Sequence, residues 1–226
     1  MKELFLLDPK ITYLNFGSFG ACPQPVFEAY QKLQLQLEKS PVQFIVHSGM
    51  ELLKSSRLRL ASYLGCAPDN LVLMTNPSYA INTIAKSIPL SKGDEVLSTN
   101  LEYGAMNRTW NYYCEKSGAK YKQSKLNFPI ESVASFLEDF WAGYNEKTKV
   151  VFISHITSST GLIIPVKEIC EEAKKRGLLT IIDGAHVPGQ LPLNIAELDA
   201  DVYVGACHKW MMAPKGASFL YVKNKE

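Results

Sequence analysis

The sequence has few features of a secreted, membrane-bound or nucleic-acid-binding protein. Its five cysteines form no CxxC pair and are odd in number, so we expect no disulfide framework and a reducing, cytoplasmic location. The formal net charge is only +2, which gives no support for binding to nucleic acid or to a membrane surface. The early apolar run at residues 4–7 is too short for a signal peptide, and no stretch is apolar enough to span a bilayer.

Motifs for several common kinds of site are missing as well. The four histidines do not cluster with the cysteines, so no metal site is expected. The chain has no GxxxxGKS/T loop and no strand-linked GxGxxG, so nucleotide binding has little support. Residues 17–20, Gly-Ser-Phe-Gly, do not form a GxSxG elbow, which argues against a serine hydrolase.

What the chain does contain is a regular alternation of apolar strands and amphipathic helices. Several of the strands are continuous apolar runs, which is typical of strands covered on both faces. The pattern predicts an α/β fold, a three-layer α-β-α sandwich with a mainly parallel, seven-stranded sheet. The expected strands are 71–75, 95–98, 119–124, 149–153, 178–182, 202–206 and 218–222, and the expected helices are about 78–87, 105–117, 130–141 and 165–176.

Residues 1–65 are expected to form an N-terminal arm with two helices, and residues 66–226 a large domain. The first helix follows Pro23 and has apolar side chains on one face at positions 26, 30, 33 and 37. The second helix has them at positions 50, 53, 60 and 64. Gly65 is expected to end the second helix, because glycine is the usual residue just after a helix.

The strongest functional signal is a pair of side chains that follow two strands. Asp183 comes directly after the strand at 178–182, and Lys209 follows the strand at 202–206. Ligands of such sheets bind beyond the carboxyl ends of the strands. An apolar setting lowers the pKa of an amine, which suits imine formation, and a buried carboxylate needs a cation such as a pyridinium. The pair fits a pyridoxal phosphate (PLP) enzyme; an Asx turn at Asp183 and a solvated Lys209 are the simpler alternatives.

Four more segments follow strand ends and give weaker signals. His186 shares a loop with Asp183, where it is either a structural histidine or a contact to the cofactor's phenolic oxygen. Ser78 stands at a helix start, where an N-cap and a phosphate site at free N–H groups are compatible. Tyr103 is explained equally well by packing and by stacking on a flat heterocycle. The hydroxyl-rich residues 154–161 fit an ordinary turn as well as a binding loop.

Together these segments resemble the aminotransferase class V family of fold-type I PLP enzymes, with isopenicillin N epimerase-like proteins as the most similar branch. No single segment is specific, but the set covers nearly the whole chain in the family's order. The resemblance implies a PLP-dependent enzyme that acts at the α-carbon of an amino acid, as an epimerase or a C–S lyase. The resembling segments are residues 13–23, 75–83, 102–105, 157–161, 183–186, 208–210 and 214–216.

The resemblance also implies roles for individual residues. Lys209 would form the Schiff base and move the proton at the α-carbon, Asp183 would pair with the pyridine nitrogen, and His186 would contact the phenolic oxygen. The other implied roles are cofactor binding by Asn76, Ser78, Tyr79 and His208 (the last three through the phosphate), ring stacking by Tyr103, a cofactor or substrate contact by Ser158, and substrate carboxylate binding by Ser18 and Gly20. A homodimer is implied too, because fold-type I sites draw residues from both subunits.

The chain departs from the family pattern at three points. Pro77 stands where relatives have alanine, and Ala206 where relatives have a polar residue that adds a phosphate contact. The family's C-terminal small domain, which supplies an arginine for the substrate carboxylate and, in desulfurases, the catalytic cysteine, is expected to be absent. A desulfurase that uses its own cysteine is therefore not expected. Two hypotheses remain, a PLP-dependent enzyme and a truncated, non-catalytic PLP-binding or assembly module.

Overall fold

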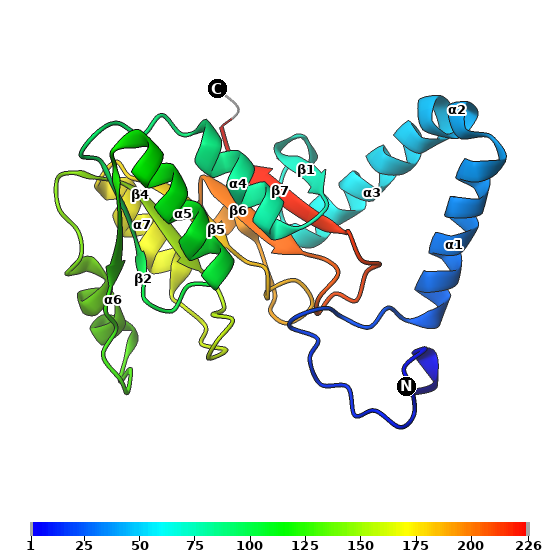
Figure 1. The fold of residues 1–226 in the computed structure, drawn as a ribbon, viewed down its shortest axis with the longest axis horizontal. Helices are drawn as coiled ribbons and strands as arrows, with labels where there is room; N and C mark the ends of the chain where they lie inside the picture. The colour runs from blue at the N-terminus through cyan, green and yellow to red at the C-terminus, as the bar shows by residue number, and fades with distance from the viewer. Residues whose placement is uncertain (1, 225–226) are drawn as a thin grey trace.

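A seven-stranded sheet forms the centre of the computed structural model, which describes residues 2–224 (Figure 1). The order across the sheet is β1-β7-β6-β5-β4-β2-β3, and β7 is antiparallel to both of its neighbours, while the other neighbouring pairs are parallel. The strands β1 to β6 therefore all end at one edge. The bounds are β1 (Leu71–Met74), β2 (Glu95–Thr99), β3 (Lys120–Ser124), β4 (Thr148–Ser154), β5 (Leu179–Asp183), β6 (Val202–Ala206) and β7 (Ser218–Val222).

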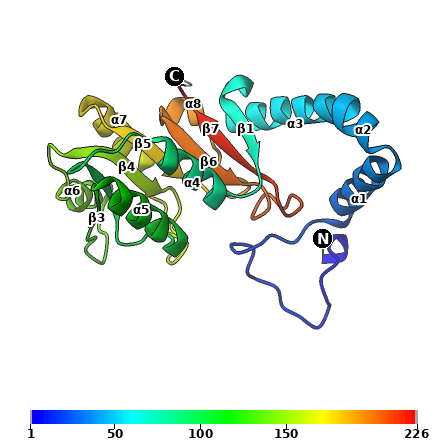
Figure 2. The same ribbon diagram turned by 45° about the horizontal axis from the view of Figure 1, so that its top comes forward.

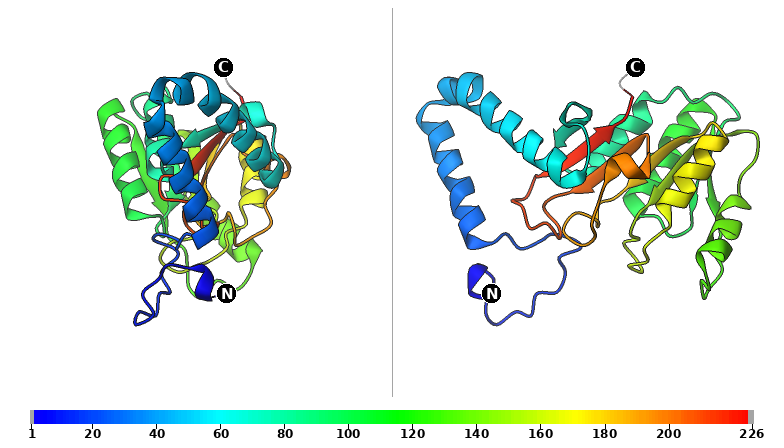
Figure 3. Two further views of the ribbon diagram at one scale, coloured as in Figure 1. Left: turned by 90° about the vertical axis from the view of Figure 1, so that its right-hand side faces the viewer. Right: turned by 180° about the vertical axis from the view of Figure 1, so that it is seen from behind.

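Helices cover both faces of this sheet. The helices α4 (Pro77–Ser87) and α5 (Gly104–Ser117) pack on one face. The other face is covered by α6 (Val133–Trp141), α7 (Val166–Lys175) and the short α8 (Ile195–Leu198). The view from behind in Figure 3 shows α7, in yellow, on the side opposite α4 and α5. The predicted three-layer fold with a mainly parallel, seven-stranded sheet is confirmed.

Alternating side chains of the central strands fill the two cores. Within β4, Val150 and Phe152 belong to the core beneath α4 and α5, while Val151 and Ile153 belong to the core beneath α6 and α7. All four side chains are at most 1% exposed. Because both faces of β4 are buried, the strand has no polar side to solvent, which explains its continuous apolar sequence.

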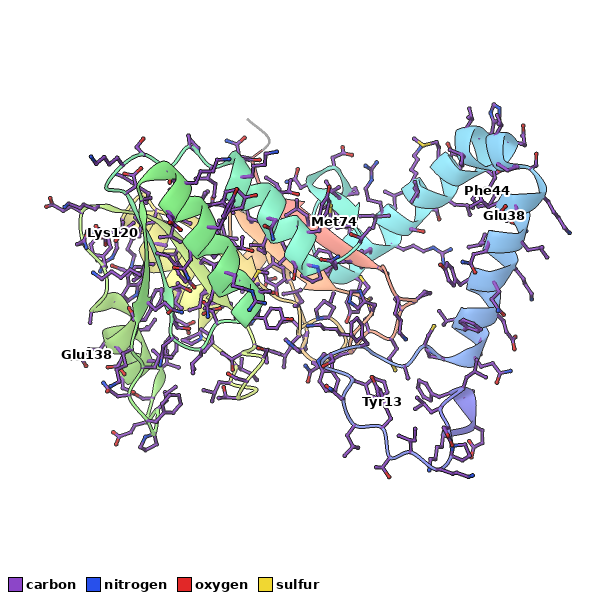
Figure 4. All side chains as sticks on the ribbon, in the orientation of Figure 1. Tyr13, Glu38, Phe44, Met74, Lys120 and Glu138 are labelled. Atoms are coloured by element: carbon purple, nitrogen blue, oxygen red, sulfur yellow. The ribbon has the colours of Figure 1, made fainter. Side chains whose placement is uncertain are left out.

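The N-terminal helices extend away from the sheet as an arm (Figure 2). The arm consists of α1 (Gln24–Lys39), α2 (Pro41–Gln43), the π-helical turn η2 (Phe44–Ser48) and α3 (Gly49–Leu64). Both predicted helices are present, but α1 contains no buried residue and α3 buries only Ala61 and Leu64. Glu38 and Phe44 lie on the outer part of the arm in Figure 4.

Most predicted boundaries of helices and strands differ from the structure by one to three residues. The helix expected from residue 130 begins at Val133, because Ser132 caps it and forms a reciprocal pair of hydrogen bonds with Ser135. The first strand ends at Met74 rather than residue 75. Gly65 ends α3 in the predicted left-handed conformation, with φ of +63°. Short 3-10 turns, η1 (Lys2–Leu4) and η3 (Pro68–Asn70), complete the described elements.

None of the helices within residues 2–224 combines the length and the apolar character needed to cross a membrane.

Candidate cofactor site

A cavity of about 540 Å³ opens at the edge of the sheet where β1 to β6 end. Its walls come from the loops after five strands and from the irregular segment before α1. The loops lie together because parallel strands bring their carboxyl ends to one edge. The lining residues are Asn15, Gly17, Ser18, Phe19, Asn76, Pro77, Ser78, Tyr103, Ser158, Asp183, Ala185, His186, His208 and Lys209.

Lys209 supplies the amine of the cavity. It follows β6 by three residues and is partly buried. Burial lowers its pKa because the ammonium loses water, while the nearby Asp183 carboxylate acts in the opposite direction. The amine is thus easier to deprotonate than that of a surface lysine, which is what a nucleophilic lysine requires.

Asp183 is the last residue of β5 and is 5% exposed. Its Oδ1 accepts a hydrogen bond of 3.0 Å from the Ala185 amide, as in the Asx turn considered from the sequence. Burial raises its pKa, and this effect is opposed by the Ala185 amide and by Lys209. A carboxyl group that is buried at a cavity wall gains from a cationic ligand, because a nearby positive charge favours its ionised form.

His186 lies between Lys209 and Trp210. Its Nε2 is 3.3 Å from Lys209 Nζ, and its Nδ1 accepts a hydrogen bond of 3.2 Å from the Trp210 indole. Burial, followed by the charge of Lys209, lowers its pKa to about 4. The imidazole is therefore neutral near pH 7. The sequence placed Trp210 beside Lys209, but it gave no signal for this contact.

The start of α4 forms the side of the cavity nearest β1. Asn76, and not Ser78, is the N-cap of α4, and its side chain accepts a hydrogen bond of 2.8 Å from the Tyr79 amide. The N-cap prediction for Ser78 is wrong, because Pro77 takes the first helical position and the cap is Asn76, two residues earlier. Since Pro77 has no N–H, the first turn offers the Ser78 amide and hydroxyl to the cavity. Tyr79 is exposed and is not among the lining residues.

His208 completes this side of the cavity. Its Nδ1 lies 2.8 Å from the Ala217 carbonyl oxygen and must donate to it, because a carbonyl can only accept. Burial lowers the pKa of His208. The Phe19 ring stacks on the imidazole at a centroid distance of 6.1 Å. His208 thus has a fixed ring orientation.

The loop after β2 places Tyr103 in the cavity wall and contains the buried acid Glu102. Tyr103 is 49% exposed, so its ring is open to a ligand. The neighbouring Glu102 is 6% exposed and accepts hydrogen bonds from Thr99 Oγ1 (2.6 Å), Ser154 Oγ (2.6 Å) and the Ser154 amide (2.9 Å). Burial raises its pKa to about 7. Glu102 was not predicted from the sequence, although an acid that follows an apolar strand was the available signal.

The segment before α1 closes the cavity from outside. Ser18 lines the cavity, together with Asn15, Gly17 and Phe19. Gly20 does not line it; its amide donates a hydrogen bond of 2.7 Å to the His208 carbonyl. A Cβ at Gly20 would lie 1.8 Å from the Lys209 carbonyl oxygen, so no other residue fits this approach. Gly20 therefore holds the segment against the backbone that carries Lys209.

The side chains gathered here match the chemical groups of PLP. The cavity provides an amine for the aldehyde, a buried acid for the ring nitrogen, an exposed aromatic ring for the heterocycle, and a helix start with a serine for the phosphate. Its volume is that of a small-molecule site. Except for Gly20 and Tyr79, every residue that the sequence assigned to the site lies on the cavity wall.

Comparison with known proteins agrees with this geometry. A family model described as aminotransferase class-V matches residues 13–226. Isopenicillin N epimerase of Amycolatopsis lactamdurans is 38% identical over 223 residues, which are 97% of this chain and 56% of the relative. A putative L-cysteine desulfhydrase of Oryza sativa subsp. japonica is 28% identical, over 96% of this chain and 48% of the relative. The chain spans about half the length of these curated relatives.

Solved structures share the fold at low sequence identity. A mutant of C-DES with glycine covalently linked to its PLP cofactor has a TM-score of 0.87 and 24% identity, and the match covers 99% of this chain and 60% of that one. A cysteine desulfurase from Thermococcus onnurineus NA1 has a TM-score of 0.86 and 23% identity, over 99% of this chain and 56% of that one. These structures support the architecture described above.

Proposed function

This chain belongs to the class-V aminotransferase family, and we propose that it binds PLP through Lys209 and acts at the α-carbon of an amino acid. The family is PLP-dependent, and its relatives include epimerases and C–S lyases. The observation that carries the proposal is the partly buried Lys209 amine, which lies in one cavity with Asp183 and His186. When bound, PLP supplies an aldehyde for an amine and a ring that accepts electrons from the α-carbon.

Lys209 is proposed to hold the cofactor and then to move the proton at the α-carbon. Both tasks need a free amine, which the lowered pKa of Lys209 favours. Asp183 is proposed to hold a proton on the ring nitrogen, a role supported by its burial at the end of β5. His186 is proposed to donate Nε2–H to the phenolic oxygen, while Tyr103 covers the ring.

Phosphate binding is proposed for the start of α4 and for His208. Ser78 would donate through its hydroxyl and amide, and Asn76 fixes the turn that presents them. The Tyr79 amide donates to Asn76 Oδ1, so it would have to leave this hydrogen bond in order to bind the phosphate. His208 can donate to the phosphate from Nε2 once it is protonated, because Nδ1–H is already directed to Ala217.

Substrate binding is proposed for the segment before α1 and the loop after β4. Ser18 and Ser158 line the cavity and can donate to a carboxylate or to a cofactor oxygen. The part of Gly20 in this proposal is to hold Ser18 and Phe19 in place through its contact with His208. Phe19, held in this way, stacks on the His208 ring.

The catalytic part of the proposal is tested by proton exchange. The chain is incubated with PLP and a panel of amino acids in deuterated water, and loss of the α-proton signal is followed by NMR. Exchange that needs Lys209, and is lost in Lys209→Ala, is the expected result. If PLP binds but no amino acid exchanges its α-proton, the chain is a non-catalytic PLP-binding module and the catalytic part is wrong.

We also propose a homodimer with residues 1–65 as an arm and residues 66–226 as the large domain. Support comes from exposed apolar side chains along α1 and η2, among them Val26, Leu33 and Ile45. A cytoplasmic location is proposed from the five cysteines, all of which are free. Sedimentation velocity tests the dimer, and a single species at the monomer mass over a wide concentration range would contradict it.

A further inference from the structure

We propose that Trp210 is a positioning residue that fixes the tautomer of His186 and so directs an N–H donor at the Lys209 amine. The inference deepens the proposed function and rests on the same site. It concerns the proton on His186, which no sequence motif specifies.

The first step is the hydrogen bond between the two rings. Trp210 Nε1 lies 3.2 Å from His186 Nδ1. An indole N–H can only donate, so Nδ1 must accept with its lone pair. A neutral imidazole carries one N–H, and it is therefore on Nε2.

The second step is that both rings are held in place. A Cβ at Gly17 would lie 3.3 Å from His186 Cε1, so the glycine backbone packs directly against the imidazole. Gln190 Nε2 donates a hydrogen bond of 2.6 Å to the His186 carbonyl oxygen. The Trp210 ring stacks on Phe16 at a centroid distance of 6.1 Å and an interplanar angle of 21°. The indole and the imidazole therefore have little freedom to rotate away from each other.

The third step concerns Lys209. His186 Nε2 is 3.3 Å from Lys209 Nζ. With the proton on Nε2, the amine must accept this contact through its lone pair, which is the unprotonated form of lysine. Burial lowers the pKa of both groups, which favours the same neutral pair, while Asp183 alone among the nearby charges favours the ammonium.

The opposite tautomer does not fit these contacts. A proton on Nδ1 would face the indole N–H, so two donors would meet at 3.2 Å. It would also turn the Nε2 lone pair toward Nζ, which would stabilise an ammonium. Trp210 thus disfavours the charged form of Lys209 through the His186 imidazole.

The test is a tautomer measurement on the full chain by NMR. Histidine is labelled with ¹⁵N, and two-bond proton–nitrogen correlations report which ring nitrogen carries the proton near pH 7. The His186 signals are identified by their loss in His186→Gln. The wild-type chain, measured without PLP, is expected to show a neutral His186 with the proton on Nε2. A proton on Nδ1, or an imidazolium, overturns the proposal.

The substitution Trp210→Phe keeps an aromatic ring against Phe16 and removes the N–H donor. The His186 tautomer ratio is expected to shift by about fivefold toward Nδ1–H, the effect of one neutral hydrogen bond. Trp141→Phe, on α6, is the matched control and is expected to leave the His186 signals unchanged. An unchanged tautomer ratio in folded Trp210→Phe contradicts the proposal. If circular dichroism shows that Trp210→Phe does not fold, the His186 tautomer of the wild-type chain alone tests the proposal.

A second arm adds PLP and records the absorbance of the lysine–PLP imine. A wild-type chain with Nε2–H on His186 but no imine band would sink the proposed function and leave the tautomer assignment standing. An imine band together with Nδ1–H on His186 would overturn the tautomer assignment and leave the proposed cofactor binding standing. The two failures are therefore distinguishable.

Discussion

The sheet domain and the N-terminal arm use the same kind of amphipathic helix and reach different results. The apolar faces of α4, α5 and α7 are buried against the sheet. The apolar face of α1 is as regular in sequence, yet none of its residues is buried. Ile153 in β4 is 0% exposed, whereas Ile45 in η2 is 61% exposed. An apolar pattern in the sequence therefore predicts a helix and its apolar face, but not the surface that this face contacts.

The largest expected effect separates these two regions by one matched substitution. Ile153→Ala leaves a cavity between the sheet and its helices and should lower the free energy of unfolding by about 2–5 kcal/mol. Ile45→Ala removes an exposed side chain and should change it by less than about 0.5 kcal/mol in the monomer. Urea denaturation at low protein concentration measures both. Equal losses would mean that the arm is buried in the monomer, contrary to the structure.

The next prediction concerns the pH dependence of stability that the buried Glu102 contributes. The pKa of Glu102 is raised from its ordinary 4.5 to about 7, so its protonated form stabilises the fold. This contribution is complete below about pH 4.5 and is lost as the pH rises through about 7, a change of roughly 3 kcal/mol. Asp183, whose pKa is raised, and His155 and His186, whose pKa values are lowered to about 4, also affect stability in this range, but they do so in both chains. The contribution of Glu102 is therefore the difference between the wild-type and Glu102→Gln curves.

The matched control for Glu102 stands at the other end of the same strand. Glu95 begins β2, is 8% exposed and accepts a hydrogen bond of 2.7 Å from Asn145. Glu95→Gln is expected to keep the contribution of Glu102 to the pH dependence of stability, because it leaves the Glu102 contacts in place. Unfolding free energies measured across the pH range decide the matter. A Glu102→Gln chain that follows the wild-type curve would show that Glu102 is not the titrating group.

The smallest expected effect distinguishes a cap at the site from a cap elsewhere. Asn76→Ala removes the N-cap of α4, and Ser132→Ala removes that of α6; each should cost about 1 kcal/mol of stability. Only Asn76→Ala should also change the affinity for PLP, because Asn76 holds the Tyr79 amide beside Ser78. Thermal unfolding and a PLP titration give the two readings. Equal PLP affinities in both variants would exclude the start of α4 from the cofactor site.

The sequence predicted the sheet and most of the cavity because strand ends in a parallel sheet meet at one edge. Lys209, Asp183 and His186 could be found in this way, and all three line the cavity. The contacts of Trp210 with His186 and of Asn76 with Tyr79 could not, because they depend on side-chain orientations that only the folded loops determine. The exposure of α1 could not be predicted either, since burial depends on a neighbouring surface.

The comparison of the two regions also locates the chemistry. The buried carboxyl edge of the sheet shifts the pKa of Lys209 downward and those of Asp183 and Glu102 upward, because burial disfavours charge. The helices of the arm contribute no residue to the lining of this cavity. The site therefore depends on the core that the sheet domain builds, and the exposed arm remains available for another surface.

The central claim is that Lys209 is the residue that binds PLP, and absorbance tests it most directly. PLP is added to the wild-type chain, to Lys209→Ala and to Lys174→Ala, a control that removes an exposed lysine paired with Asp199. We expect a lysine–PLP imine band in the wild-type and Lys174→Ala chains and its complete loss in Lys209→Ala. No band in the folded wild-type chain, or an unchanged band in Lys209→Ala, would contradict it.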